Sequence, residues 1–143
     1  MARALIITAP GINCDLELAE AFQLAGVDPC PVHINKLMRN PSMVDNADLI
    51  GLPGGFSYGD AIAAGRIMAN LMRVTLYGAL VEAVRRGVPI IAPCNGFQIA
   101  VQLGLLPGPT PGRRTTSRSS SSNLSQYFPH GFIPFPCPGR AGS

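Results

Sequence analysis

Cys94 is the residue of this sequence whose position best fits a chemical role. It follows a short apolar run, Pro89 to Ala92, and precedes a helical pattern from Phe97 to Leu103, with Gly96 two positions after it. This order predicts a strand, a tight turn and a helix, which is the layout of a nucleophile elbow. The N-terminus of a helix favours the thiolate, and the thiolate is the nucleophilic form of cysteine. A lone cysteine is more often a buried structural residue, but this context favours the nucleophile.

A second turn, running from Pro53 to Asp60, could act together with Cys94. Its sequence, PGGFSYGD, lacks the glycine spacing, the lysine and the hydroxyl of a phosphate-binding loop. As punctuation after a strand it is an ordinary signal. As an oxyanion hole it has adjacent glycines, Gly54 and Gly55, whose backbone amides are unobstructed. The amide of Asn95, directly after the nucleophile, is the expected further donor.

The pattern of apolar runs and breakers predicts the elements that position these two turns. We expect buried strands at residues 4–8, 31–34, 49–52 and 89–92. We expect one helix capped by Asp15 with Leu16, Ala19, Phe22 and Leu24 on its apolar face, and a long one from Ala61 to Arg85. Strands that alternate with helices pair in parallel with right-handed crossovers. The expected fold is a three-layer α/β/α sandwich with a mostly parallel sheet, and both turns fall at the carboxyl edge of that sheet, where ligands bind.

Length and composition point to one domain and exclude several classes. The chain has 143 residues and is 47% apolar, which is enough for one core. It shows neither an apolar stretch of membrane-spanning length nor a secretory signal, so we expect a cytoplasmic protein. Its four cysteines form no Cys-x-x-Cys pair and its histidines are not at zinc spacing, so we expect neither a metal site nor disulfides.

The character of the sequence changes near residue 108. Residues 1–108 hold 7 basic and 8 acidic residues, whereas residues 109–143 hold 4 basic residues and no acidic one, and are rich in serine, proline and arginine. Such a segment cannot bury enough apolar surface to fold. We therefore divide the chain into a folded part at 1–108 and a low-complexity, disordered tail at 109–143. Arginines without interleaved aromatic residues are a weak nucleic-acid footprint.

Three segments give the chain a specific resemblance. The segments are Pro10 to Asp15 (PGINCD), Leu52 to Asp60 followed by Ala64 and Gly65, and Pro93 to Gln98 (PCNGFQ). In order and in spacing they resemble the glutaminase subunits of phosphoribosylformylglycinamidine synthase, which are class I glutamine amidotransferases of purine synthesis. The resemblance covers about residues 4–108. It implies a flavodoxin-like sheet, Cys94 as the nucleophile, and Gly54, Gly55 and Asn95 as oxyanion donors.

The resemblance also implies a reaction and a partner. The Cys94 thiolate would attack the side-chain amide of glutamine, release ammonia and form a γ-glutamyl thioester that water hydrolyses. Ammonia would pass to the synthetase subunit. That partner, and not this chain, is expected to bind ATP, magnesium and the ribonucleotide, so no cofactor is assigned here.

The chain departs from the family in its proton-transfer residues. The histidines are His33 and His130, neither in the family's His-x-Glu pattern, and no acidic residue follows Glu82. Ala92 also stands where the family usually has glycine. We therefore expect impaired glutaminase activity and a domain without its C-terminal part, its tail being either a displaced reading frame or a linker.

Two other functions stay open on the sequence alone. One is a catalytically dead module that docks on the synthetase. The other is a cysteine-based α/β protein of the redox or repair type. A domain cut after the elbow helix also predicts uncovered apolar side chains, with Met68, Met72 and Leu76 as candidates.

Overall fold

The computed structural model describes residues 1–60 and 65–106. The predicted disordered tail at 109–143 lies outside the described residues, as do positions 61–64. The elements in chain order are β1 (Arg3–Thr8), α1 (Asp15–Leu24), β2 (Asp28–His33), α2 (Ile34–Arg39), the 3₁₀ turn η1 (Pro41–Asn46), β3 (Leu49–Gly51), the 3₁₀ turn η2 (Ser57–Asp60), α3 (Arg66–Thr75), α4 (Tyr77–Arg85), β4 (Ile90–Ile91) and α5 (Asn95–Leu103).

The strands form one parallel sheet in the order β2-β1-β3-β4. Strand β1 lies inside the sheet, and its four central residues, from Ala4 to Ile7, are all buried. A strand that is covered on both faces needs a continuous apolar run of this kind rather than an alternating one. The predicted parallel sheet is confirmed.

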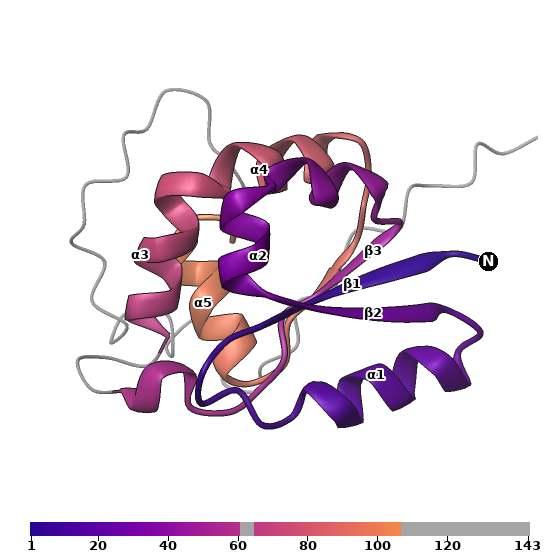
Figure 1. Cartoon of the computed structure of the whole chain (residues 1–143), viewed down its shortest axis with the longest axis horizontal. Coiled ribbons are helices and arrows are strands. Elements are labelled where there is room, and N and C mark those ends of the chain that lie inside the picture. Colours follow the sequence, from indigo (N-terminus) through magenta and orange to yellow (C-terminus); the bar gives the residue numbers. More distant parts are fainter. Residues whose placement is uncertain (61–64, 107–143) are drawn as a thin grey trace, which may run out of the picture. The chain divides into compact units, whose positions relative to one another are not determined.

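Helices cover the sheet on both sides, which gives the three layers predicted (Figure 1). On one side α1 packs Leu18 and Phe22 against Ala4 and Ile6 of β1. On the other side a larger core joins β1, β2 and β3 to helices α2 to α5. Side chains of β1 alternate between these two cores because successive residues of a strand point to opposite faces. The fold is therefore a flavodoxin-like α/β sandwich.

Helix α1 begins one residue earlier than the sequence predicted, and it turns a different face inward. Its N-cap is Cys14, and Asp15 is the first helical residue rather than the cap. Leu16 and Leu24 are 75% and 83% exposed. The buried residues are Leu18 and Phe22, which are one helical turn apart and so lie on the same face of the helix. Their contacts with β1 determine which face of α1 is buried. The prediction for Leu16 and Leu24 was wrong.

The long helix predicted up to Arg85 is two helices. Helices α3 and α4 meet at Leu76 and are bent by 79°. The bend lets both helices cover the same face of the sheet, and Met68, Met72 and Leu76 are fully buried. These three candidates for exposure are therefore core residues. Among the described residues, no single helix is long and apolar enough to cross a membrane.

The strands at the ends of the sheet differ from their predicted ranges. Strand β2 starts at Asp28 and ends at His33, and Ile34 already opens α2. Strand β4 is only Ile90–Ile91.

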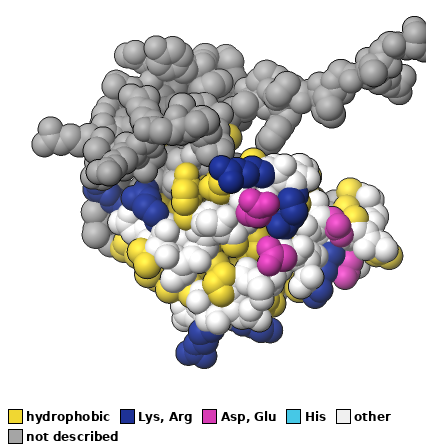
Figure 2. Space-filling model, turned by 90° about the horizontal axis from the view of Figure 1, so that it is seen from above, with side chains coloured by type: hydrophobic (Ala, Val, Ile, Leu, Met, Phe, Trp, Pro, Cys, Tyr) yellow, Lys and Arg dark blue, Asp and Glu magenta, His cyan; other side chains and the backbone are white. Residues whose placement is uncertain are grey.

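On the face drawn in Figure 2, acidic and basic side chains lie next to one another. Among the described residues, Arg85 pairs with Glu82 within α4, and Arg86, directly after α4, pairs with Asp45 of η1.

Candidate active site

Cys94 occupies the sharp turn between β4 and α5. Its backbone has φ 51° and ψ −116°, a region that residues with a side chain rarely adopt. Such a conformation costs about 1–3 kcal/mol and persists where the surroundings enforce it. The carbonyl of Cys94 accepts hydrogen bonds from the amides of Phe97 (3.0 Å) and Gln98 (3.3 Å), which lock it to the first turn of α5. The residue is exposed, so the predicted elbow presents its thiol to solvent.

Gly96 allows α5 to start this close to the sheet. A Cβ atom built on Gly96 would lie 1.9 Å from the carbonyl oxygen of Leu52, the residue directly after β3. Only a hydrogen atom fits there. The short approach brings the elbow against the turn that follows β3, where the glycine pair lies.

The turn that holds Gly54 and Gly55 is fastened to the loop after β1. The amide of Cys14 donates to the carbonyl of Gly54 (3.3 Å), the amide of Phe56 to Gly11 (2.9 Å), and the amide of Tyr58 to Pro10 (2.7 Å). Gly55 has φ +132°, and a Cβ there would lie 2.7 Å from the amide nitrogen of Asn13. The two loops therefore form one unit beside the elbow, and a glycine at 55 is required by both its dihedral angle and its neighbour.

Gly54 lies between two cysteines. A Cβ atom built on Gly54 would be 3.4 Å from the Cβ of Cys94, 3.7 Å from the Cβ of Cys14 and 3.7 Å from the Sγ of Cys14. The structure therefore brings Gly54 against the predicted nucleophile. It also adds Cys14, which the sequence analysis placed in a motif but not in the site.

The amide of Gly55 points away from the amide of Cys14. The C=O and N–H of a trans peptide point in opposite directions. Because the carbonyl of Gly54 points at the amide of Cys14, the amide of Gly55 points away from α1. Among the described residues it donates to no backbone acceptor. An amide without a backbone acceptor, in the turn beside the predicted nucleophile, is suited to a developing negative oxygen.

The side chain of Asn95, the residue whose amide is the predicted donor, makes contacts that the sequence did not predict. It is 1% exposed. Its Oδ1 accepts from the amide of Ser57 (3.3 Å), and its Nδ2 donates to Oε1 of Gln98 (3.1 Å). The side chain thus ties the first turn of α5 to the glycine turn. The Oγ of Ser57, also buried, has no hydrogen-bond partner among the described residues. We call these two side-chain hydrogen bonds the Asn95 latch; the sequence carries no signal for it, because an asparagine after Cys94 is compatible with many contacts.

The structure gives His33 a structural role. Its Nδ1 accepts from the amide of Asn35 at 3.2 Å and so caps α2. His130 lies outside the described residues. Burial raises the pKa of Tyr58, which is next to the latch and has φ 54°. Within residues 1–60 and 65–106, no three His, Cys, Asp or Glu side chains gather as a metal site would require.

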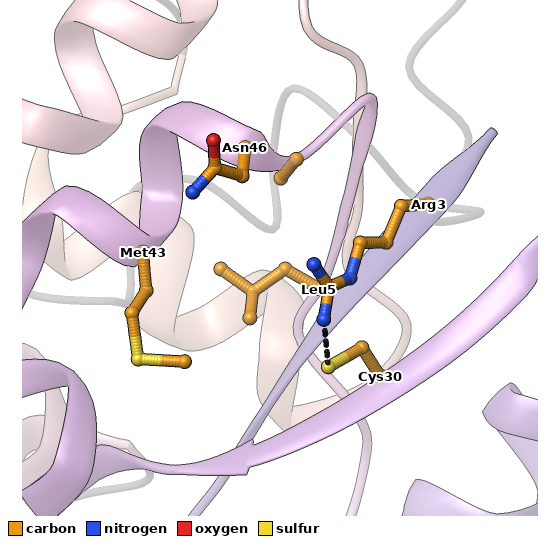
Figure 3. A pocket seen from close by; sticks show the side chains of 6 residues that line it. Arg3, Leu5, Cys30, Met43 and Asn46 are labelled. Atoms are coloured by element: carbon orange, nitrogen blue, oxygen red, sulfur yellow. Dashed lines mark hydrogen bonds between the residues drawn. The ribbon is translucent and has the colours of Figure 1, made fainter.

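A small pocket lies away from this site, among the starts of the strands (Figure 3). Arg3, Leu5, Cys30, Met43, Asn46 and Ala47 line it. A guanidinium nitrogen of Arg3 donates to the Sγ of Cys30 at 3.4 Å. Ligands of parallel sheets bind at the opposite, carboxyl edge, where Cys94 lies, so the elbow and not this pocket is the candidate active site.

Comparison with known proteins agrees with this geometry. The model of the CobB/CobQ-like glutamine amidotransferase domain matches residues 1–134. The chain belongs to this amidotransferase family. The family match continues beyond residue 108 into positions that the structure does not describe.

Relatives within the amidotransferase family have a common name. The PurQ subunit of phosphoribosylformylglycinamidine synthase from Dehalococcoides mccartyi is 42% identical over 121 residues, 84% of this chain and 48% of that protein. The PurQ subunit from Methanococcus maripaludis is 39% identical over 85% of this chain and 45% of that protein. A chain in the structure of PurLQS from Thermotoga maritima matches with a TM-score of 0.62 and 35% identity over 73% of this chain and 45% of that one. The chain thus spans about half the length of the relatives it matches.

Proposed function

We propose that this chain provides the nucleophile and the oxyanion hole of a glutaminase that feeds ammonia to phosphoribosylformylglycinamidine synthase in purine biosynthesis. The observation that carries the proposal is the strained Cys94 turn at the head of α5, held against Gly54 in a chain of the amidotransferase family. The names of the PurQ relatives, which are subunits of that synthase, support the substrate and the partner. The cytoplasmic location expected from the sequence belongs to the same proposal.

The chemistry begins with the thiolate of Cys94. It attacks the carboxamide carbon of glutamine, and the negative charge that develops on the carboxamide oxygen is held by the amides of Gly55 and Asn95. Collapse of this intermediate expels ammonia and leaves a γ-glutamyl thioester on Cys94. Water then releases glutamate. Gly54 provides the space for the substrate amide beside the thiol, since any side chain at this position would contact Cys94.

Proton transfer is the step that the described residues do not supply. The departing nitrogen must gain a proton and the attacking water must lose one, a task that usually falls to a histidine oriented by an acid. His33 is occupied as a helix cap, and no acidic residue follows Glu82 in the sequence. We therefore expect slow turnover by the chain alone. ATP and magnesium act on the synthetase partner in this proposal.

Reconstitution with a synthetase subunit tests this function. The 143-residue chain is mixed with the synthetase of a PurQ relative, and product formation is measured with glutamine and, separately, with ammonia as the nitrogen source. We expect glutamine-dependent product that disappears in Cys94→Ser and persists in Cys30→Ser. Binding to the synthetase without any Cys94-dependent use of glutamine would favour the docking module instead. Absence of both binding and glutamine use would refute the proposal.

A further inference from the structure

We infer that Cys14 and Cys94 form a reversible disulfide across Gly54 when the chain meets a hydroperoxide, and that Cys14 is the resolving thiol. The inference concerns regulation of the proposed glutaminase site and gains its meaning from that function. Its chemistry, however, depends only on the two thiols and can be tested without glutamine.

The geometry comes from Gly54. Its Cβ position is 3.4 Å from the Cβ of Cys94 and 3.7 Å from the Cβ of Cys14, so the two cysteine Cβ atoms lie at most about 7 Å apart. A disulfide needs Cβ atoms about 4 Å apart, so a shift of the Cys14 loop by at most about 3 Å brings the two side chains into bonding distance. The space between the two side chains is open because residue 54 has no side chain of its own. Both cysteines are exposed free thiols.

The two thiols differ in how firmly they are held. Cys94 is fixed by the strained turn and by two hydrogen bonds from α5. Cys14 precedes α1, and its Sγ donates to Oδ1 of Asn13 at 3.3 Å. Its amide is joined to the carbonyl of Gly54, so Cys14 stays beside the elbow while its side chain can rotate. This arrangement suits an attacked sulfur on Cys94 and a resolving sulfur on Cys14.

The reaction balances in two steps. The Cys94 thiolate attacks one oxygen of hydrogen peroxide, the O–O bond breaks, hydroxide leaves, and Cys94 becomes a sulfenic acid. The Cys14 thiolate then attacks the Cys94 sulfur, the S–O bond breaks, and hydroxide leaves as the S–S bond forms. With the protons of the two thiols, both hydroxides become water. Two thiols are oxidised and one peroxide is reduced, and a dithiol reductant reverses the change.

Peptide mapping can identify the bond without ambiguity. Trypsin together with a glutamate-specific protease cuts after Arg3, Glu17, Glu20, Lys36 and Arg86, which places Cys14, Cys30, Cys94 and Cys137 on four different peptides. The full chain is treated with one equivalent of hydrogen peroxide, the remaining thiols are blocked, and the cross-linked peptides are quantified by mass spectrometry. The same treatment in urea gives the reference for an unfolded chain.

In the unfolded reference sample, Cys14 should pair with Cys30 rather than with Cys94. Loop closure in a flexible chain falls roughly as the 3/2 power of loop length, so the unfolded chain favours Cys14–Cys30 over Cys14–Cys94 by about tenfold. In the folded chain we expect Cys14–Cys94 as the main product, removed by dithiothreitol. Cys30→Ser should leave it unchanged, and Cys14→Ser should leave Cys94 as a sulfenic acid.

Several outcomes separate this inference from the proposed function. Oxidation of Cys94 in the folded wild type without a bond to Cys14, or Cys14–Cys30 as the main native product, would overturn the inference. A Cys14–Cys94 bond in a chain whose reduced form shows no reaction with glutamine would uphold the inference and count against the glutaminase. A chain that uses glutamine but forms no Cys14–Cys94 bond would overturn the inference and support the glutaminase.

Discussion

Replacing Gly96 by alanine tests how closely the elbow is packed against the sheet. The added methyl carbon would lie 1.9 Å from the Leu52 carbonyl oxygen, more than about 1.5 Å inside normal contact distance. Because the oxygen belongs to backbone, relief requires that α5 move away from β3. Overpacking of this kind costs about 3 kcal/mol, which is a large share of a typical total stability of about 5–15 kcal/mol.

Gly78 provides the matched control. It lies in α4, it is exposed, and a Cβ built there meets no atom within 4 Å. Gly78→Ala should therefore stabilise the chain by about 0.5–1 kcal/mol through helix propensity alone. Urea unfolding followed by far-UV circular dichroism measures both variants. We expect a midpoint lowered by about 2 M for Gly96→Ala and raised by about 0.5 M for Gly78→Ala.

The same pair of variants shows what would refute the packing argument. Equal unfolding midpoints for Gly96→Ala and wild type would mean that α5 is not held against Leu52 as described. If Gly96→Ala fails to fold while Gly78→Ala folds, the result supports close packing of α5 against Leu52, as a lowered midpoint would. A loss of stability in both variants would mean that the change from glycine to alanine, and not the close approach, is responsible.

Three further predictions concern the residues around the elbow. Asn95→Ala should slow alkylation of Cys94 by an electrophilic glutamine analogue about tenfold, the value of one buried hydrogen bond, without changing alkylation by iodoacetamide. Gly54→Ala, whose added methyl makes only ordinary contacts, should change the free energy of unfolding by less than about 1 kcal/mol and yet block the Cys14–Cys94 disulfide, whereas Gly55→Ala should lose about 2 kcal/mol or more. Burial raises the pKa of Tyr58 above 10.0, so the contribution of Tyr58 to stability is complete below pH 10 and is lost as the pH rises through the folded-state value. Urea titrations between pH 9 and 12 should show a flatter decline for Tyr58→Phe than for wild type, and parallel curves would contradict this.

The sheet and the elbow could be predicted because their signals are local. Strands β1 and β3 are short apolar runs that are each followed two residues later by a proline, and the turn at Cys94 is marked by Gly96. A parallel arrangement then follows from the alternation of strands and helices. The shared edge of the sheet brings the two turns together without further information.

The features that sequence analysis missed depend on tertiary contacts. The break at Leu76 has neither proline nor glycine at the break itself, and follows from the way α3 and α4 cover one face of the sheet. The inward face of α1 is chosen by β1, so Leu18 rather than Leu16 is buried. Cys14 joins the site through backbone hydrogen bonds between two loops that are about 40 residues apart along the chain. The latch made by the Asn95 side chain has the same origin.

The proposed function requires Cys94 to be a nucleophile that is selective for glutamine. The reduced chain is treated with a diazo ketone analogue of glutamine and digested with trypsin and the glutamate-specific protease. Labelling of each cysteine peptide is then measured over time, with and without competing glutamine or asparagine. We expect label on Cys94 alone, slowed by glutamine and not by asparagine. Label on Cys30 at a comparable rate, or labelling of Cys94 that glutamine does not slow, would contradict it.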